Sequence, residues 1–163
     1  MKRMVTISDV GRKFILTDPV EPALLKCRME ACRQGYPGHP DGCPKFKSCD
    51  CPPNAPWFGK LYEGPVRVAA VRFDFAGFIT WRRMLQPTWT DKALRNPRHW
   101  QGHLAAALNR YLVDVELAED EEIVFNPEAQ GIDVTVTCAT AGLKLEWPPR
   151  DKVCRVAMIA KRK

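Results

Sequence analysis

The chain has 163 residues, of which 45% are hydrophobic and 27% are charged, and its formal net charge is +6 at pH 7. This length is enough for one domain (1–163) to bury its own core, so a fold held mainly by disulfides is not required. No apolar run reaches the roughly 20 residues of a membrane span, and none forms a signal-peptide core. We therefore expect a single cytoplasmic domain with no membrane partner.

The first third of the chain predicts short strands and one helix. The apolar runs "MVTI" (4–7) and "KFIL" (13–16) are typical of two strands or an opening hairpin. Asp18 and Pro19 predict the start of a helix through "VEPALLKCR" (20–28). Seven of the fourteen prolines lie between residues 35 and 65, which argues against regular structure there.

The later part of the chain alternates between predicted strands and helices. The run 66–75 predicts a strand, and so does 153–161. Asn96 and Pro97 predict a helix start, and the apolar face that follows consists of Trp100, Leu104, Leu108, Tyr111 and Leu112. The acidic stretch "DVELAEDEE" favours a solvated turn, with an interaction tail as the alternative, and "EIVF" after it suggests a strand.

Residues 131–149 carry two competing periods. Alternation of valine with threonine predicts a strand. One helical face is also apolar, with Gly142 just past its end, and we favour this helix followed by a strand at "LKLEW". In either case Cys138 is expected to pack. Together the elements predict an α/β domain, with α+β as the alternative, in which helices pack on a small mixed sheet.

Five of the seven cysteines fall in one proline-rich and glycine-rich loop with the spacing C-x4-C-x10-C-x5-C-x-C, namely Cys27, Cys32, Cys43, Cys49 and Cys51. Seven is an odd number, and a reducing compartment disfavours disulfides. The nearby cations stabilise thiolates, with a merely solvated basic face as the alternative: Lys26, Arg28, Arg33, Lys45 and Lys47. Residues 27–56 are therefore predicted to form a metal-binding loop.

The spacing also bears on the metal. The irregular gaps differ from those of common zinc knuckles. Cys43-Pro44 and Cys51-Pro52 each place proline directly after cysteine, as at the last ligand of bacterial ferredoxins, so we expect an iron–sulfur cluster, with zinc as the alternative. His39 would then be a further candidate zinc ligand.

Four stretches together resemble a prokaryotic family of predicted metal-binding proteins of unknown function: "KCR" (26–28), "GCPKF" (42–46), "CDCPPNAP" (49–56) and "NPEAQGIDVTVTCATAGLKLEWPP" (126–149). In that family a Cys-Pro-aromatic and then a Cys-Pro-Pro precede a Glu-Ala-x-Gly-Ile-Asp-Val segment. The resemblance implies Cys27, Cys43 and Cys51 as core ligands with converging sulfur atoms, completed by Cys32 or Cys49. It implies no reaction, and residues 86–112 lack the second cysteine-rich stretch of the family.

These features predict a cysteine-ligated metal protein with a redox or accessory role, for which a redox enzyme is the candidate partner, and they assign no catalytic residues. The alternative is a zinc-stabilised module that binds single-stranded nucleic acid through basic and aromatic residues such as "WRR" (81–83) and Trp89. His99 and His103 stand at i and i+4, but Trp100 occupies the place of a metalloprotease glutamate. A surface or partly packed pair is therefore favoured.

Overall fold

The computed structural model describes residues 11–35, 40–48 and 51–163, without the side chain of Cys32. The chain forms two compact units. The first contains residues up to 16 together with 69–115 and 145–156, and the second contains 17–68, 116–144 and 157–163. In the described part of the chain, no helix is both long and apolar enough to cross a membrane.

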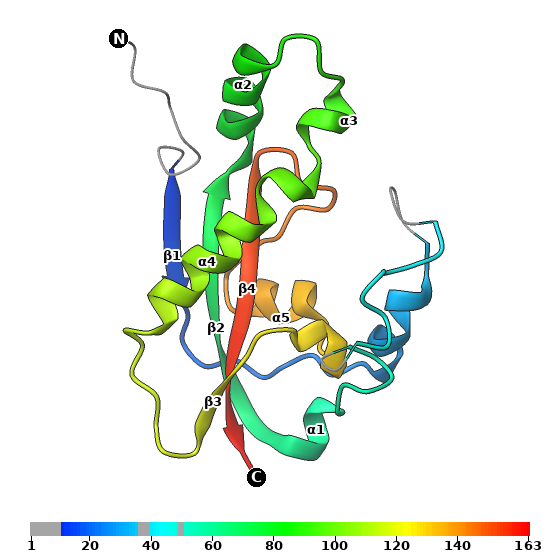
Figure 1. Cartoon of the computed structure of the whole chain (residues 1–163). Coiled ribbons are helices and arrows are strands. Elements are labelled where there is room, and N and C mark those ends of the chain that lie inside the picture. Colours follow the sequence, from blue (N-terminus) through cyan, green and yellow to red (C-terminus); the bar gives the residue numbers. More distant parts are fainter. Residues whose placement is uncertain (1–10, 36–39, 49–50) are drawn as a thin grey trace. The chain divides into compact units, whose positions relative to one another are not determined.

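The described strands form a four-stranded antiparallel sheet in the order β1-β2-β4-β3 (Figure 1). Its strands are β1 (Arg12–Leu16), β2 (Tyr62–Asp74), β3 (Glu121–Val124) and β4 (Lys152–Arg162). The prediction of a small sheet with packed helices is confirmed, and the antiparallel pairing makes it the α+β form of that prediction.

In the first unit, β1 pairs with β2 from Arg12 opposite Phe73 to Leu16 opposite Ala69. β2 then passes directly into a helix, because the Asp74 carboxylate accepts a hydrogen bond from the N–H of Gly77 and so caps α2 (Phe75–Leu85). The sequence analysis did not predict α2, whose buried residues Phe75, Phe78 and Ile79 have helical spacing over little more than one turn.

The rest of the first unit is helical. α3 (Asp91–Leu94) and a 3-10 turn, η3 (Pro97–His99), precede α4 (Gln101–Leu112). Asn96 caps η3 as predicted, through the N–H of Arg98. The predicted apolar face of α4 is buried at Trp100, Leu104, Leu108 and Leu112, whereas Tyr111 is more exposed and stacks on Phe14 with ring centroids 4.9 Å apart.

The second unit contains η2 (Lys26–Arg33), α1 (Phe58–Leu61), η4 (Pro127–Gln130) and α5 (Val134–Thr140). The favoured helix after residue 131 is confirmed as α5. Gly142 follows it with φ +78°, the left-handed conformation typical of a residue past a helix end. β3 and β4 confirm the predicted strands "EIVF" and 153–161.

Two predicted elements are wrong. Residues 20–28 do not form a helix from Asp18. They start extended, with bridges from Val20 to Val66 and from Leu24 to Ile132, because Pro22 disfavours helical backbone at the residue before it. "LKLEW" is not a strand: the chain turns there, and Glu146 accepts hydrogen bonds from the N–H groups of residues 150, 151 and 152. The predicted strand "MVTI" lies outside the described residues.

Candidate functional site

The start of the cysteine loop is fastened to residues 131–137. Leu25 donates its N–H to the carbonyl of Gly131 at 2.7 Å, and the N–H of Asp133 donates to the carbonyl of Ala23 at 2.8 Å. The N–H of Ala23 in turn donates to the hydroxyl of Thr137 at 3.0 Å. The backbone that leads into Cys27 is therefore fixed by contacts with a segment about a hundred residues away in sequence, as the separation of 114 between Ala23 and Thr137 illustrates.

Asp133 adds an ion pair beside Cys27. Its side chain is largely buried, and its Oδ2 accepts from Nε and Nη2 of Arg28 at 3.1 and 2.6 Å. Oδ1 accepts from the N–H of Val136 and caps α5. Burial alone would raise the pKa of Asp133. The hydrogen bonds from Val136 and Arg28, with the charge of Arg28, outweigh burial and hold this pKa below its usual value.

The end of the cysteine loop meets the same segment. The indole of Trp57 lies against Gly131, whose φ is +90°, and a Cβ at this position would overlap ring atoms of Trp57. Only glycine combines that backbone conformation with so close an approach. Lys26 Nζ lies 5.4 Å from the centroid of the Trp57 ring, so the first and last parts of the loop also contact each other.

The Glu-Ala-x-Gly-Ile-Asp segment (128–133) therefore has a structural role in this chain: it anchors both ends of residues 27–56. Sequence analysis placed Asp133 in a motif but did not predict its pairing with Arg28. The available signal was an Asp directly before a helical run, which is typical of an N-cap with a free second carboxylate oxygen.

Cys27 lies in η2 and is exposed, whereas Cys43 and Cys51 are half-buried on two turns. In the first turn the carbonyl of Cys43 accepts from the N–H of Phe46 at 3.0 Å. In the second, the carbonyl of Cys51 accepts from the N–H groups of Asn54 and Ala55 at 2.9 and 3.0 Å. Each of these cysteines therefore begins a hydrogen-bonded turn, which limits the positions of its sulfur atom.

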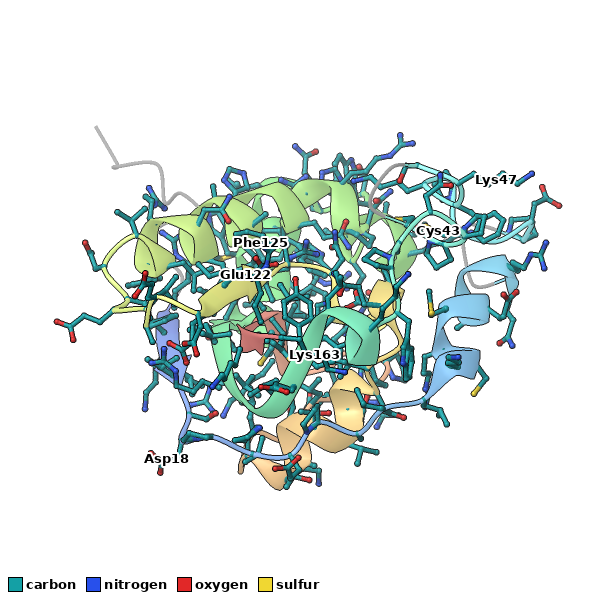
Figure 2. The ribbon with its side chains drawn as sticks, turned by 90° about the horizontal axis from the view of Figure 1, so that it is seen from below. Asp18, Cys43, Lys47, Glu122, Phe125 and Lys163 are labelled. Carbon is teal, nitrogen blue, oxygen red and sulfur yellow. The ribbon has the colours of Figure 1, made fainter. Side chains whose placement is uncertain are left out.

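The two turns are also tied to each other. The N–H of Lys47, a residue with φ +71°, donates to the carbonyl of Pro52 at 2.8 Å. The side-chain amide of Asn54 donates to the carbonyls of Lys47 and Ser48 at 2.9 and 3.2 Å. Figure 2 shows Cys43 and Lys47 on this part of the loop, at the edge of the view. The backbone around Cys43 and Cys51 is thus closed on itself.

Charge around the loop is divided between paired and unpaired cations. Arg28 pairs with Asp133, and Arg33 pairs with Glu30 at 3.1 Å while lying 5.3 Å from the ring centroid of Phe46. Lys45 and Lys47 are exposed, and neither has an ion pair within the described residues. These two lysines follow Cys43 by two and four residues and leave positive charge available to thiolates.

The thiols of Cys27, Cys43 and Cys51 are not in disulfides. Among the residues that the structure describes, no three His, Cys, Asp or Glu side chains are grouped so that they could hold a metal ion. The sulfur atoms of Cys27, Cys43 and Cys51 therefore do not converge on one point, contrary to expectation. The predicted ligands Cys49 and the side chain of Cys32 lie outside the description, as does His39. The five-cysteine metal site therefore stays a prediction.

The remaining cysteines lie elsewhere. Cys138 is fully buried in α5, as expected for a packing residue. Cys154 is half-buried on β4 in the first unit, and burial raises the pKa of its thiol despite the opposing charges of Arg72 and Lys152.

The basic and aromatic residues singled out for nucleic-acid binding contact each other. The guanidinium of Arg82 lies 4.9 Å from the ring centroid of Trp89, and Arg83 forms an ion pair with Asp91. Trp89 also packs on His99, with ring centroids 5.1 Å apart. Burial and the charge of Arg82 lower the pKa of His99, while His103 is exposed. These internal contacts do not favour the nucleic-acid alternative, which stays a prediction.

Comparison of the chain with protein-family models, with curated proteins and with solved structures gives no match.

Proposed function

We propose that residues 27–56 bind a metal centre through cysteine thiolates, with an iron–sulfur cluster favoured over zinc, and that the protein has a redox or accessory role. The observation that carries this proposal is the pair of tied turns at Cys43 and Cys51, whose half-buried thiols are not in disulfides. A loop so rich in proline and cysteine needs either a core or a ligand to order it, and Cys27 and Lys47 are exposed rather than packed.

The donor chemistry fits a thiophilic metal. Thiolate ligands favour zinc and iron–sulfur clusters over hard cations such as magnesium or calcium. A site of four thiolates around a divalent metal carries net negative charge, which the exposed Lys45 and Lys47 would offset. Cys43 and Cys51 would supply two ligands, and the others would come from Cys27, Cys32 and Cys49.

The anchors supply rigidity at the two ends of the loop. Arg28 is held by Asp133, and Trp57 is held against Gly131, so the chain can position ligands between fixed ends. A bound cluster would supply one-electron transfer, and a bound zinc would supply structural order. Cys27 is exposed, so a partner redox enzyme could approach the proposed centre directly.

The test is a panel of single substitutions in the whole chain, purified without oxygen and analysed for metal per chain. Cys43→Ser and Cys51→Ser should lose the metal, because each removes a proposed ligand. Cys154→Ser, in the other unit, should retain it and is the matched control. Full metal retention in both loop variants would reject the proposal, and equal loss in all three would mean that the metal reports folding rather than ligation.

A further inference from the structure

The first unit contains a second site, away from the cysteine loop in sequence. A surface cavity of about 270 Å³ lies where β1 begins and β2 ends. Four cationic side chains and one carboxylate line it: Arg12, Lys13, Arg72, Lys152 and Asp74. Phe73 also belongs to the lining, but its side chain is fully buried in the core and exposes no surface to a ligand. So many cations around one small cavity require an explanation in terms of charge.

The strand register places like charges side by side. Lys13 of β1 stands directly opposite Arg72 of β2, so the two side chains share a face of the sheet. Lys152 belongs to the same group, since both it and Arg72 act electrostatically on the Cys154 thiol. Like charges opposite each other destabilise a strand pair, so the fold keeps an unfavourable arrangement here.

Nothing in the described part of the chain neutralises this group by an ion pair. Arg12, Lys13 and Arg72 have no salt bridge or side-chain hydrogen bond there, whereas Arg67 and Arg162 elsewhere in the chain are paired with Glu121 and Glu122. Glu146 interacts electrostatically with Lys152, but its carboxylate already accepts hydrogen bonds from the backbone N–H groups of residues 150, 151 and 152.

The one carboxylate of the lining, that of Asp74, is hydrogen-bonded to the start of α2. Oδ1 of Asp74 accepts from the N–H of Gly77 at 2.9 Å, and its Oδ2 also lies against Gly77 at the start of α2. The helix N-terminus stabilises that negative charge, so Asp74 offsets the four cations incompletely.

We propose that this cavity binds the phosphate group of a small phosphorylated molecule. The guanidinium of Arg72 matches the geometry of phosphate oxygens, Lys13 opposite it adds a point charge on the same face of the sheet, and Lys152 adds another. The volume of about 270 Å³ is close to the lower end of the roughly 300–1,000 Å³ of small-molecule pockets. It suits a phosphate with a short organic part better than an extended polynucleotide.

Titration calorimetry on the whole chain tests this with two probes, inorganic phosphate and glycerol 3-phosphate. Both should bind saturably, and tighter binding of glycerol 3-phosphate would identify a phosphomonoester, rather than free phosphate, as the ligand class. Arg72→Gln should weaken binding by about tenfold or more, the effect of losing a charged hydrogen bond. Lys13→Gln should also weaken it, while Lys92→Gln, an equal charge change at an exposed residue of α3 outside the cavity, should not.

Asp74→Asn keeps the test decisive if Arg72→Gln fails to fold. Asparagine retains the oxygen that caps α2 but removes the negative charge, so the affinity for phosphate should rise. The proposal is overturned if neither probe binds saturably, if Lys13→Gln and Lys92→Gln weaken binding equally, or if Asp74→Asn does not tighten it. It is also overturned if a single-stranded oligonucleotide binds and Arg72→Gln leaves phosphate binding unchanged.

Discussion

Removal of the Asp133 carboxylate should destabilise the second unit by about 2 kcal/mol, the sum of a lost helix cap and a weakened ion pair. The hydrogen bond from the N–H of Val136 to Asp133, which caps α5, contributes about 1 kcal/mol, as N-caps commonly do. The pair with Arg28 adds at most about 1 kcal/mol, because the Arg28 side chain is 49% exposed and water screens the attraction. Asp133→Ala removes both contributions, whereas Asp133→Asn keeps the cap and loses only the charge.

Urea unfolding of the whole chain, followed by circular dichroism, measures both variants. Asp133→Asn should cost about 1 kcal/mol or less, and Asp133→Ala clearly more. Asp91→Ala is the control, because it removes the partner of Arg83 in an exposed pair without removing a cap side chain, and it should cost little. Equal losses for Asp133→Ala and Asp91→Ala would refute the assignment of Asp133 as an anchor.

The pH dependence of stability provides an independent check on Asp133. The folded-state pKa of this group is held below its unfolded value. Its contribution to stability is therefore present above the usual aspartate range and is lost as the pH falls through the folded-state pKa. Asp133→Asn should flatten this acid limb of the stability curve, and an unchanged acid limb would contradict the proposed ion pair.

Three further predictions concern other described residues. Gly131→Ala should destabilise the chain more than Gly142→Ala, because both glycines have positive φ but only Gly131 lies against Trp57. It should also alter tryptophan fluorescence. Equal losses of stability in the two variants would show that this packing contact contributes nothing. Burial, and then the hydrogen bond to Glu122, raise the pKa of Tyr62 to about 12, so ultraviolet titration should show one tyrosine ionising near that pH, and Tyr62 should stabilise the fold until the pH passes from about 10 towards 12. Glu122→Gln should lower this pKa, and no change would contradict the pairing. Metal-free protein should be alkylated faster at the exposed Cys27 than at Cys154, whose pKa burial raises; mass spectrometry that shows the reverse order would contradict the described exposures.

Sequence patterns predicted the elements whose apolar residues are continuous along the chain. The helix after Asn96 is present because its apolar residues follow one helical period, the apolar run at 66–75 lies largely in β2, and Gly142 marked the end of α5. The wrongly predicted helix from Asp18 fails because contacts far along the chain compete with local preference: Leu24 and Leu25 bond to Ile132 and Gly131.

The candidate site, like the fold, could be predicted from the sequence only in part. Sequence spacing predicted a metal site in the cysteine loop, and this stays a prediction. The anchors of the loop were not predictable, because Arg28 and Asp133 are separated by 105 residues and no local pattern links them. Five cysteines also allow several sets of four ligands, and no sequence pattern predicts the hydrogen bond from Lys47 to Pro52 that ties the turns at Cys43 and Cys51 together.

The central claim is that residues 27–56 bind a metal through thiolates. The most direct measurement is the content of iron, zinc and acid-labile sulfide per chain, with a visible spectrum, after purification without oxygen. The account predicts a coloured protein containing iron and acid-labile sulfide, both lost in Cys43→Ser. One zinc per chain without sulfide would contradict the preference for an iron–sulfur cluster, and a colourless chain with neither metal nor sulfide would contradict the central claim.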